Sequence, residues 1–153
     1  MKKKFFLVIF SLVLSFIIVE ILLSKFYPQE RSDSWRTQGS NGVYFNISNS
    51  VAKHEFFGLT DKVSVQYTFG KYHNRILPKN KSFSDRKILL MGDSFIFGWL
   101  AEDEYTIQNE LQNYFKNFEV INSSAGGFSD ADQFVYLREF CNLIKPEYVI
   151  FFT

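Results

Sequence analysis

A serine in the second half of the chain has the surroundings expected of a nucleophile. It belongs to the tripeptide Gly92-Asp93-Ser94, which directly follows the apolar run 87–91. A nucleophilic serine needs its hydroxyl held on a sharp turn, near backbone amides that can stabilise an oxyanion. Gly92 allows the chain to turn without a Cβ clash, and Asp93 can accept hydrogen bonds that fix the loop. The sequence therefore favours acyl-transfer chemistry at Ser94.

A second loop could supply such amides. It follows the apolar run 118–122 and reads Ser123-Ser124-Ala125-Gly126-Gly127. Ligands of parallel sheets bind at the carboxyl ends of the strands, so amides of this loop could point at the same spot as Ser94. We interpret Ser123 and Ser124 as residues that hydrogen-bond within the loop rather than as nucleophiles.

Three short apolar runs are predicted to be strands that carry these loops. They cover 87–91, 118–122 and 148–152, and the first is typical of a strand buried on both faces. The stretches between them have helical spacing. Strands alternating with helices predict an α/β fold with a parallel sheet and right-handed crossovers.

Each of the two predicted helices has an N-terminal cap and an apolar face. Thr106 caps the first helix, whose apolar positions are Ile107, Leu111, Tyr114 and Phe118. Ser129 caps the second in a capping box with Asp132, and Pro146 ends it. The apolar positions of the second helix are Phe134, Leu137, Cys141 and Ile144.

An apolar segment at the N-terminus predicts a membrane anchor. Three lysines at 2–4 precede the segment from Phe5 to Phe26, which holds one acid, Glu20. As a helix, these 22 residues would be about 33 Å long, enough to cross a hydrocarbon core of about 30 Å. No small-residue cleavage site follows, so we favour an uncleaved signal anchor over a cleaved signal. The positive-inside rule then places everything after about Tyr27 outside the cytoplasm, in a single-pass topology.

The rest of the chain divides into a tether and one domain. With residues 1–27 as the anchor, residues 28–50 are polar and rich in turn formers, as expected of a linker. Residues 51–153 form the predicted domain, which begins with one or two edge strands between Val51 and Arg86.

Charge and cysteine content exclude several classes of function. Lys and Arg number 17 against 16 for Asp and Glu, which leaves no basic footprint for nucleic acid. The one cysteine, Cys141, cannot form an internal disulfide or a multi-thiolate metal site, and we interpret it as a small buried hydrophobe. The acidic run 102–104 is interpreted as a solvated segment before a helix, with a cation site as the alternative.

These blocks resemble the GDSL or SGNH hydrolase family. Residues 86–99 look like the family's first block, 120–133 like its second, and 145–152 like its third strand, while 26–29 are similar to membrane-anchored members. By this likeness Ser94 would be the nucleophile and an oxyanion donor through its amide, with Gly127 as a second donor. The resemblance implies the N-terminal portion of a three-layer, flavodoxin-like fold with a parallel sheet, and neither a cofactor nor a metal ion.

The resemblance ends before the family's last blocks. These are a Gly-X-Asn-Asp stretch, whose Asn gives a third oxyanion donor, and an Asp-X-X-His that holds the base and its orienting acid. His54 and His73 both precede Ser94, and we interpret them as surface or edge imidazoles. We expect the 153 residues to be the front part of a longer protein, through a fragmentary or interrupted reading frame, and to be inactive as given. Biological truncation is the alternative.

The preferred hypothesis is a membrane-anchored, extracytoplasmic esterase or acyl transferase that forms an acyl-Ser94 intermediate. Its partners would be the lipid bilayer and an ester-bearing small molecule, glycan or lipid, with no nucleic acid. The alternative is a non-catalytic, anchored α/β module that binds a partner. A flavodoxin-like or nucleotide-binding domain ranks last, because neither a Gly-X-Gly-X-X-Gly loop nor a Walker loop is present.

We expect alkaline carbonate washing to leave the protein in the membrane pellet. Burying the apolar side chains between Phe5 and Phe26 strongly favours lipid over water. Recovery from the soluble fraction of a shortened chain that begins near Lys25 would show instead that the segment is a cleaved signal.

Overall fold

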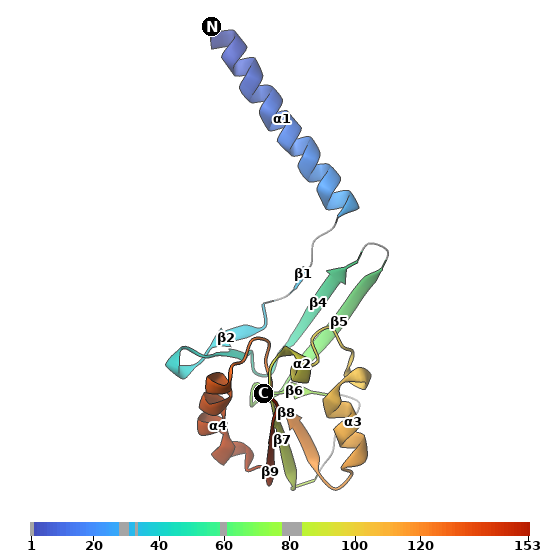
Figure 1. Ribbon diagram of the computed structural model, residues 1–153, viewed down its shortest axis with the longest axis vertical. Helices are drawn as coiled ribbons and strands as arrows, with labels where there is room; N and C mark the ends of the chain where they lie inside the picture. Colours follow the sequence, from blue (N-terminus) through green and yellow to red (C-terminus); the bar gives the residue numbers. More distant parts are fainter. Residues whose placement is uncertain (1, 28–30, 33, 59–60, 78–83) are drawn as a thin grey trace. The chain divides into compact units, whose positions relative to one another are not determined.

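The computed structural model describes residues 2–27, 31–32, 34–58, 61–77 and 84–153 (Figure 1). These residues form two compact units, each considered by itself. The first unit comprises Met1–Arg31 and Glu55–Val63, and the second comprises Ser32–His54 and Ser64–Thr153.

The first unit contains the predicted N-terminal helix. Helix α1 covers Lys2–Phe26, and its length and composition are sufficient to cross a membrane. Considered within its own unit, the helix has no buried residue. An export signal near an N-terminus has the same properties, so the helix is established and its topology stays a prediction.

The strands form one large sheet and one small one. The seven-stranded sheet has the order β1-β4-β5-β6-β8-β7-β9 and the small sheet pairs β2 with β3. Their bounds are β1 (Arg31–Ser32), β2 (Arg36–Gln38), β3 (Tyr44–Asn46), β4 (Val51–Phe57), β5 (Lys62–Phe69), β6 (Arg75–Ile76), β7 (Lys87–Met91), β8 (Glu119–Asn122) and β9 (Tyr148–Phe151).

The three strands predicted from apolar runs are confirmed, and they run parallel. Leu89 at the centre of β7 faces Ile121 of β8 on one side and Val149 of β9 on the other. The whole sheet is mixed rather than parallel, because β6 pairs antiparallel with both β5 and β8. A short connection of residues 70–74 joins β5 to β6, and such connections produce antiparallel pairs. The fold class is therefore α/β with a mixed sheet.

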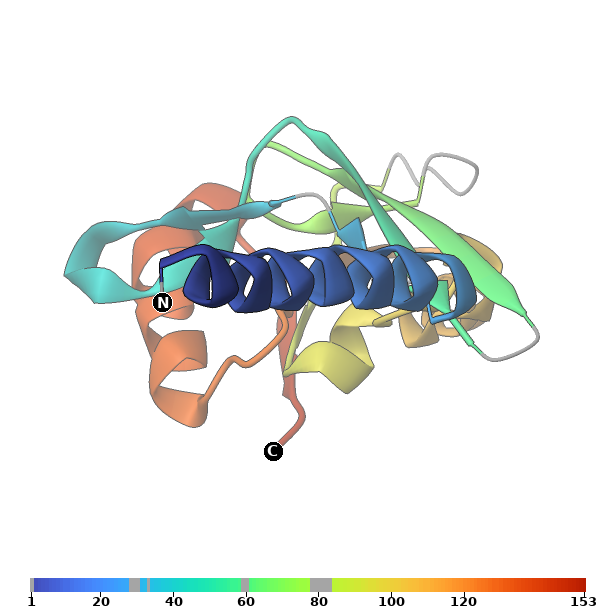
Figure 2. The ribbon, with the colours of Figure 1, turned by 90° about the horizontal axis from the view of Figure 1, so that it is seen from above.

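Helices α3 (Ile107–Tyr114) and α4 (Asp130–Ile144) lie on opposite sides of the parallel strands (Figure 1, Figure 2). The side chains of β7 alternate between them. Leu89 and Met91 belong to a buried cluster that contains Tyr136 and Ile144 of α4. The other cluster contains Ile88, Leu90 and Val120, against which Leu111 of α3 packs. Strand β7 is thus buried on both faces, as its composition predicted.

The predicted apolar face of α3 is confirmed only in part: Leu111 packs against the cluster of Ile88 and Leu90, but the fully buried residues of the helix are polar. Thr106 is its N-cap and accepts a hydrogen bond from the N–H of Asn109, as expected. However, Ile107 and Tyr114 are exposed, and the helix ends before Phe118. The buried residues of the helix are instead Gln108, Asn109 and Gln112.

The reason lies in the backbone of β8. This strand pairs with β6 only at Asn122, so backbone groups nearer its start need other partners. Gln108 Nε2 donates to the carbonyl of Val120 at 3.0 Å, and Gln112 Oε1 accepts from the N–H of Val120 at 2.9 Å. Gln112 Nε2 also donates to the carbonyl of Phe118 at 2.8 Å. The glutamines replace a neighbouring strand along this edge.

The capping box of α4 is confirmed, but its apolar face is shifted. Ser129 and Asp132 each accept a hydrogen bond from the other's backbone N–H. Phe134 is exposed and Cys141 is only partly buried, contrary to prediction. The helix instead directs Tyr136 and Phe140 at Phe45 on β3, an aromatic partner that the helix sequence does not reveal.

Residues 34–50, within the predicted linker, contain folded structure in the second unit. They hold β2, the short helix η1 (Ser40–Gly42) and β3. Trp35, Val43 and Phe45 are buried. Because these apolar side chains are scattered among turn-forming residues, the composition of the segment indicates a linker and does not reveal the buried positions. Residues 28–30 and 33 of the predicted linker lie outside the described residues.

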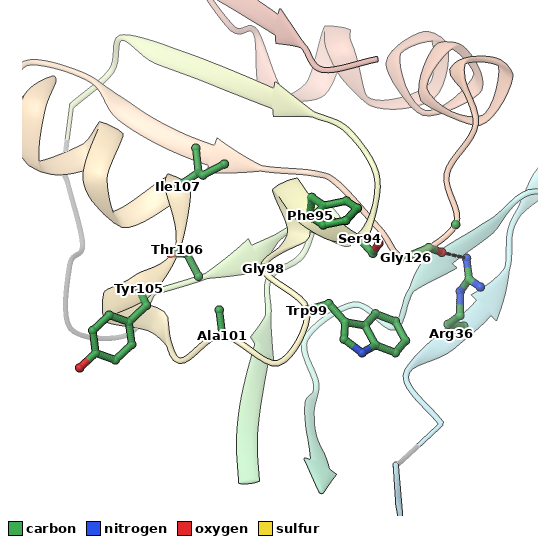
Figure 3. A pocket seen from close by; sticks show the side chains of 11 residues that line it. Arg36, Ser94, Phe95, Gly98, Trp99, Ala101, Tyr105, Thr106, Ile107 and Gly126 are labelled. Atoms are coloured by element: carbon green, nitrogen blue, oxygen red, sulfur yellow. Dashed lines mark hydrogen bonds between the residues drawn. The ribbon is translucent and has the colours of Figure 1, made fainter. Parts of the chain in front are cut away.

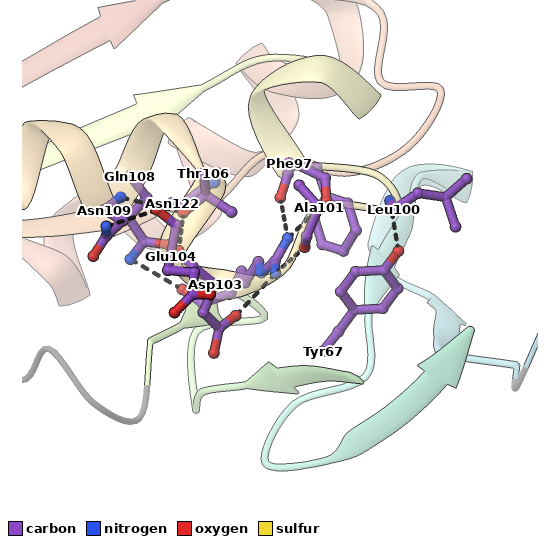
Figure 4. A network of polar contacts seen from close by, with 12 residues as sticks. Tyr67, Phe97, Leu100, Ala101, Asp103, Glu104, Thr106, Gln108, Asn109 and Asn122 are labelled. Carbon is purple, nitrogen blue, oxygen red and sulfur yellow. Dashed lines mark hydrogen bonds and ion pairs between the residues drawn. The ribbon is translucent and has the colours of Figure 1, made fainter. Parts of the chain in front are cut away.

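Arg75 on β6 is completely buried and binds the loop that follows the candidate nucleophile. Figure 4 labels Phe97, Ala101 and Asp103 of this loop and draws their polar contacts. Its Nη1 donates to the carbonyls of Phe97 and Gly98 at 2.9 and 2.8 Å. Its Nη2 donates to the carbonyl of Ala101 at 2.8 Å and to Asp103 Oδ1 at 2.9 Å. Burial lowers the pKa of Arg75, and the hydrogen bond to Asp103 opposes this shift. The four acceptors pair both terminal nitrogens of the buried guanidinium, while its Nε has no acceptor among the described residues.

We expect Arg75→Met to lower the free energy of unfolding by about 3–5 kcal/mol, because it leaves a carboxylate and three carbonyls without their donor. Urea denaturation of the full chain in detergent, followed by tryptophan fluorescence, measures this. The control is Arg86→Met, which removes an exposed pair with Glu147 and should cost much less. Equal losses for the two variants would contradict a central role for Arg75.

Candidate functional site

Ser94 lies at the carboxyl end of β7, at the first position of the short helix α2 (Ser94–Phe97). Asp93 is the N-cap, and its Oδ1 accepts from the N–H of Phe95 at 2.9 Å. Asn122 at the end of β8 donates from Nδ2 to the carbonyl of Ile96 at 2.7 Å. The strand ends therefore fix both ends of the turn that presents Ser94.

The glycine that precedes this turn is sterically required. A Cβ added to Gly92 would lie 2.5 Å from Cγ1 of Ile96 in α2. Backbone and side chain would have to shift to admit it, because real Cβ atoms do not approach so closely. Gly92 thus lets α2 pack directly onto the end of β7.

Ser94 lines a pocket of about 630 Å³ in the second unit (Figure 3). Much of the wall is aromatic, with Phe95, Trp99 and Tyr105 along it. Phe95 and Tyr105 are 82% and 75% exposed, so they form the open side of the pocket. Among the described residues that line the pocket, Arg36 from β2 is the charged one. Such a pocket suits an apolar or ring-shaped ligand with a polar group near Ser94.

The glycine loop reaches the same pocket through a tight turn. The N–H of Phe128 donates to the carbonyl of Ala125 at 3.1 Å, which closes the turn around Gly126 and Gly127. Gly127 has φ +75°, and a positive φ at the third position is the feature of a type II turn, which favours glycine. Both glycines line the pocket with Ser94.

Two backbone N–H groups at the pocket have no protein acceptor. Within the described part of the chain, neither the N–H of Ser94 nor that of Gly127 donates a hydrogen bond. The hydroxyl of Ser94 likewise has no partner among these residues. Unpaired N–H groups beside a serine hydroxyl could bind the oxygen of a polarised carbonyl. The structure brings Ser94 and Gly127 together around one space.

Neither histidine lines the pocket. The prediction for His54 was a surface or edge imidazole, and the surface alternative is wrong, because His54 on β4 is fully buried among the rings of Trp35, Tyr67 and Trp99. The ring of His73 hydrogen-bonds the carbonyl of Asn46. Among the described residues, the pocket lining contains no imidazole or carboxylate. The arrangement can therefore bind and polarise an ester carbonyl, but these residues do not supply a general base.

The neighbouring serines are enclosed. Ser123 donates from its hydroxyl to Tyr136 at 2.7 Å, and Tyr136 donates to the carbonyl of Tyr72. Burial raises the pKa of Tyr136, so its phenol stays protonated and keeps this donor role. Ser124 is also completely buried. Neither hydroxyl is open to a substrate.

The acidic run 102–104 is not wholly solvated, because Asp103 pairs with Arg75. Over the described residues, no group of three or more His, Cys, Asp or Glu side chains could hold a metal ion.

Sequence reasoning missed Arg36 and did not assign a role to Trp99. Arg36 lies in the predicted linker, 90 positions from the glycine it contacts, and no local pattern links the two. Trp99 belongs to the first family-like block, but its contact with Gly126 follows only from the fold.

No protein-family model, curated protein or solved structure matches this chain. The resemblance to the SGNH hydrolases therefore stays a prediction from the sequence motifs.

Proposed function

We propose that this protein is a membrane-anchored, extracytoplasmic serine esterase or acyl transferase of the SGNH hydrolase type. The observation that carries the proposal is the shared pocket of the Ser94 hydroxyl and the unpaired N–H groups of Ser94 and Gly127. Acyl transfer through a serine requires a nucleophile and donors for the oxyanion around one space, and the backbone here supplies two amide donors beside the hydroxyl.

In this mechanism Ser94 Oγ attacks the carbonyl carbon of the ester. The carbonyl oxygen becomes an oxyanion held by the two N–H groups, and the bond to the alcohol then breaks to leave an acyl-Ser94. A general base takes the serine proton and returns it to the departing alcohol. Water releases the acyl group in an esterase, and a second alcohol receives it in a transferase.

The base is the part of this mechanism that the described pocket residues do not provide. In SGNH hydrolases it is the histidine of the Asp-X-X-His block. The proposal therefore assigns the general base to a group other than the described residues that line this pocket.

The arrangement of the second unit supports an SGNH-type fold within the same proposal. Strand β7 lies between β8 and β9, and α3 and α4 lie on opposite sides of these strands (Figure 1). Catalytic groups at the carboxyl ends of parallel strands are the rule in open α/β sheets. The aromatic wall of Phe95, Trp99 and Tyr105 suits an acyl chain or a sugar ring, in keeping with an acylated small molecule, glycan or lipid.

We expect a fluorophosphonate probe to label the protein produced from its own gene in membranes. Ser94→Ala should abolish labelling, because the probe reacts with an activated serine hydroxyl. The control Ser64→Ala removes an exposed hydroxyl on β5 and should leave labelling unchanged.

Residues 1–153 alone should not label, since their described pocket lacks a base. Labelling at Ser94 in this form would promote His54 or His73 to catalyst. A folded gene product that binds esters but never labels would favour the non-catalytic binding module instead.

We expect Gly127→Val to lower kcat more than it raises KM, because it disturbs an amide used chiefly in the transition state. Losing one oxyanion donor typically costs about 10²- to 10³-fold in rate. Tryptophan fluorescence checks that the variant folds, and an unchanged kcat in folded Gly127→Val would remove Gly127 from the site.

A further inference from the structure

The carbonyl of Gly126 is held by a charged donor. Arg36 on β2 donates from Nη2 to this oxygen at 2.6 Å (Figure 3). The C=O and N–H of one trans peptide point in opposite directions. A donor that fixes the oxygen of Gly126 therefore fixes the direction of the N–H of Gly127, which belongs to the same peptide.

We infer that Arg36 is a positioning residue for the oxyanion site: it holds the Gly126–Gly127 peptide with the Gly127 N–H toward the reacting carbonyl. The inference deepens the proposed function and rests on it. Arg36 acts through this peptide and need not touch the substrate.

This peptide needs such a hold because two glycines flank it. Glycine has the widest choice of φ and ψ, and a Cβ at Gly127 would meet nothing within 4 Å, so side-chain packing does not restrain it. If the peptide rotated by half a turn, the carbonyl of Gly126 would replace the N–H and would repel an oxyanion. A charge-assisted hydrogen bond is roughly twice as strong as a neutral one, so Arg36 disfavours that rotation.

A second contact restrains the same residue. A Cβ added to Gly126 would lie 2.6 Å from Cζ3 of Trp99, so the indole ring packs directly against the Gly126 backbone. Trp99 is held in turn by ring contacts with Trp35 and His54 at 5.6 and 5.2 Å. The peptide is thus fixed at its oxygen by Arg36 and at the Gly126 Cα by Trp99.

The β2–β3 hairpin holds the glycine loop at two points. Arg36 pairs in register with Asn46 of β3, and Asn46 Nδ2 donates to the carbonyl of Ser124 at 3.2 Å. One side chain from each strand therefore holds a carbonyl of the loop. These two contacts fix the backbone position of Arg36, although the residue itself is exposed.

Steady-state hydrolysis of the neutral ester p-nitrophenyl acetate by the full gene product tests the inference. A neutral substrate has no anion for Arg36 to attract, so the assay isolates positioning. Arg36→Gln should lower kcat roughly 10- to 100-fold with little change in KM, as expected for a misplaced catalytic group. Arg36→Lys keeps a charged donor and should recover part of this loss. The control Arg138→Gln removes an exposed arginine on α4 and should leave both constants unchanged.

A double variant gives a readout that a merely structural role would not move. Arg36→Gln and Gly127→Val both disturb the same N–H, so their combined loss in kcat should be smaller than the product of the single losses. Multiplicative losses would overturn the inference. If Arg36→Gln does not fold, as judged by tryptophan fluorescence, Arg36→Lys takes its place in the double variant. The same comparison of combined and single losses in kcat then tests the inference.

The outcomes separate the two proposals. Unchanged kcat in folded Arg36→Gln, with Ser94→Ala inactive, overturns the positioning role and leaves the proposed function standing. A rise in KM alone also overturns it and makes Arg36 a substrate contact. A wild-type gene product with no Ser94-dependent turnover contradicts the proposed function itself.

Discussion

The buried guanidinium of Arg75 is the interaction on which the pocket depends. Its two terminal nitrogens gather three carbonyls and one carboxylate from residues 97–103, while its plane lies over the rings of Tyr67 and Phe97. A loop folded back on itself leaves carbonyls pointing inward, and each needs a donor. This loop contributes Trp99 and Ala101 to the pocket wall, so the same donor that satisfies its carbonyls also shapes the pocket.

The candidate site is therefore two backbone loops, each held by an arginine from elsewhere in the second unit. Arg75 holds the loop after α2, and Arg36 holds the glycine loop after β8. In both cases the arginine binds carbonyl oxygens. The groups that would bind a ligand are backbone N–H groups and one hydroxyl. Because each N–H points where its peptide points, the site requires peptides of fixed orientation. Fixing the opposite end of a peptide is the direct way to achieve this.

The sequence predicted the local parts of this arrangement and missed the distant ones. Continuous apolar runs identified β7, β8 and β9, and the side chains of Thr106 and Ser129 identified two helix starts, because strand burial and capping depend on near neighbours. The buried face of α3 was predicted only in part, at Leu111, because Gln108 and Gln112 bind the backbone of β8, a partner that periodicity cannot reveal. Arg36 was unpredictable for the same reason, since its acceptor is 90 positions away.

The two loops of the candidate site are fixed by different kinds of contact. Ser94 is fixed by short-range contacts, because Gly92 admits α2 to the end of β7 and Asp93 caps it. The Gly127 N–H has less local support: its peptide lies between two glycines in a turn closed by the hydrogen bond from Phe128 to Ala125, and a Cβ at Gly127 would meet nothing within 4 Å. Its direction therefore depends also on Arg36 of the β2–β3 hairpin. Altering its turn would displace the nucleophile Ser94. A shift of the remote β2–β3 hairpin would instead misdirect the N–H of Gly127, the oxyanion donor.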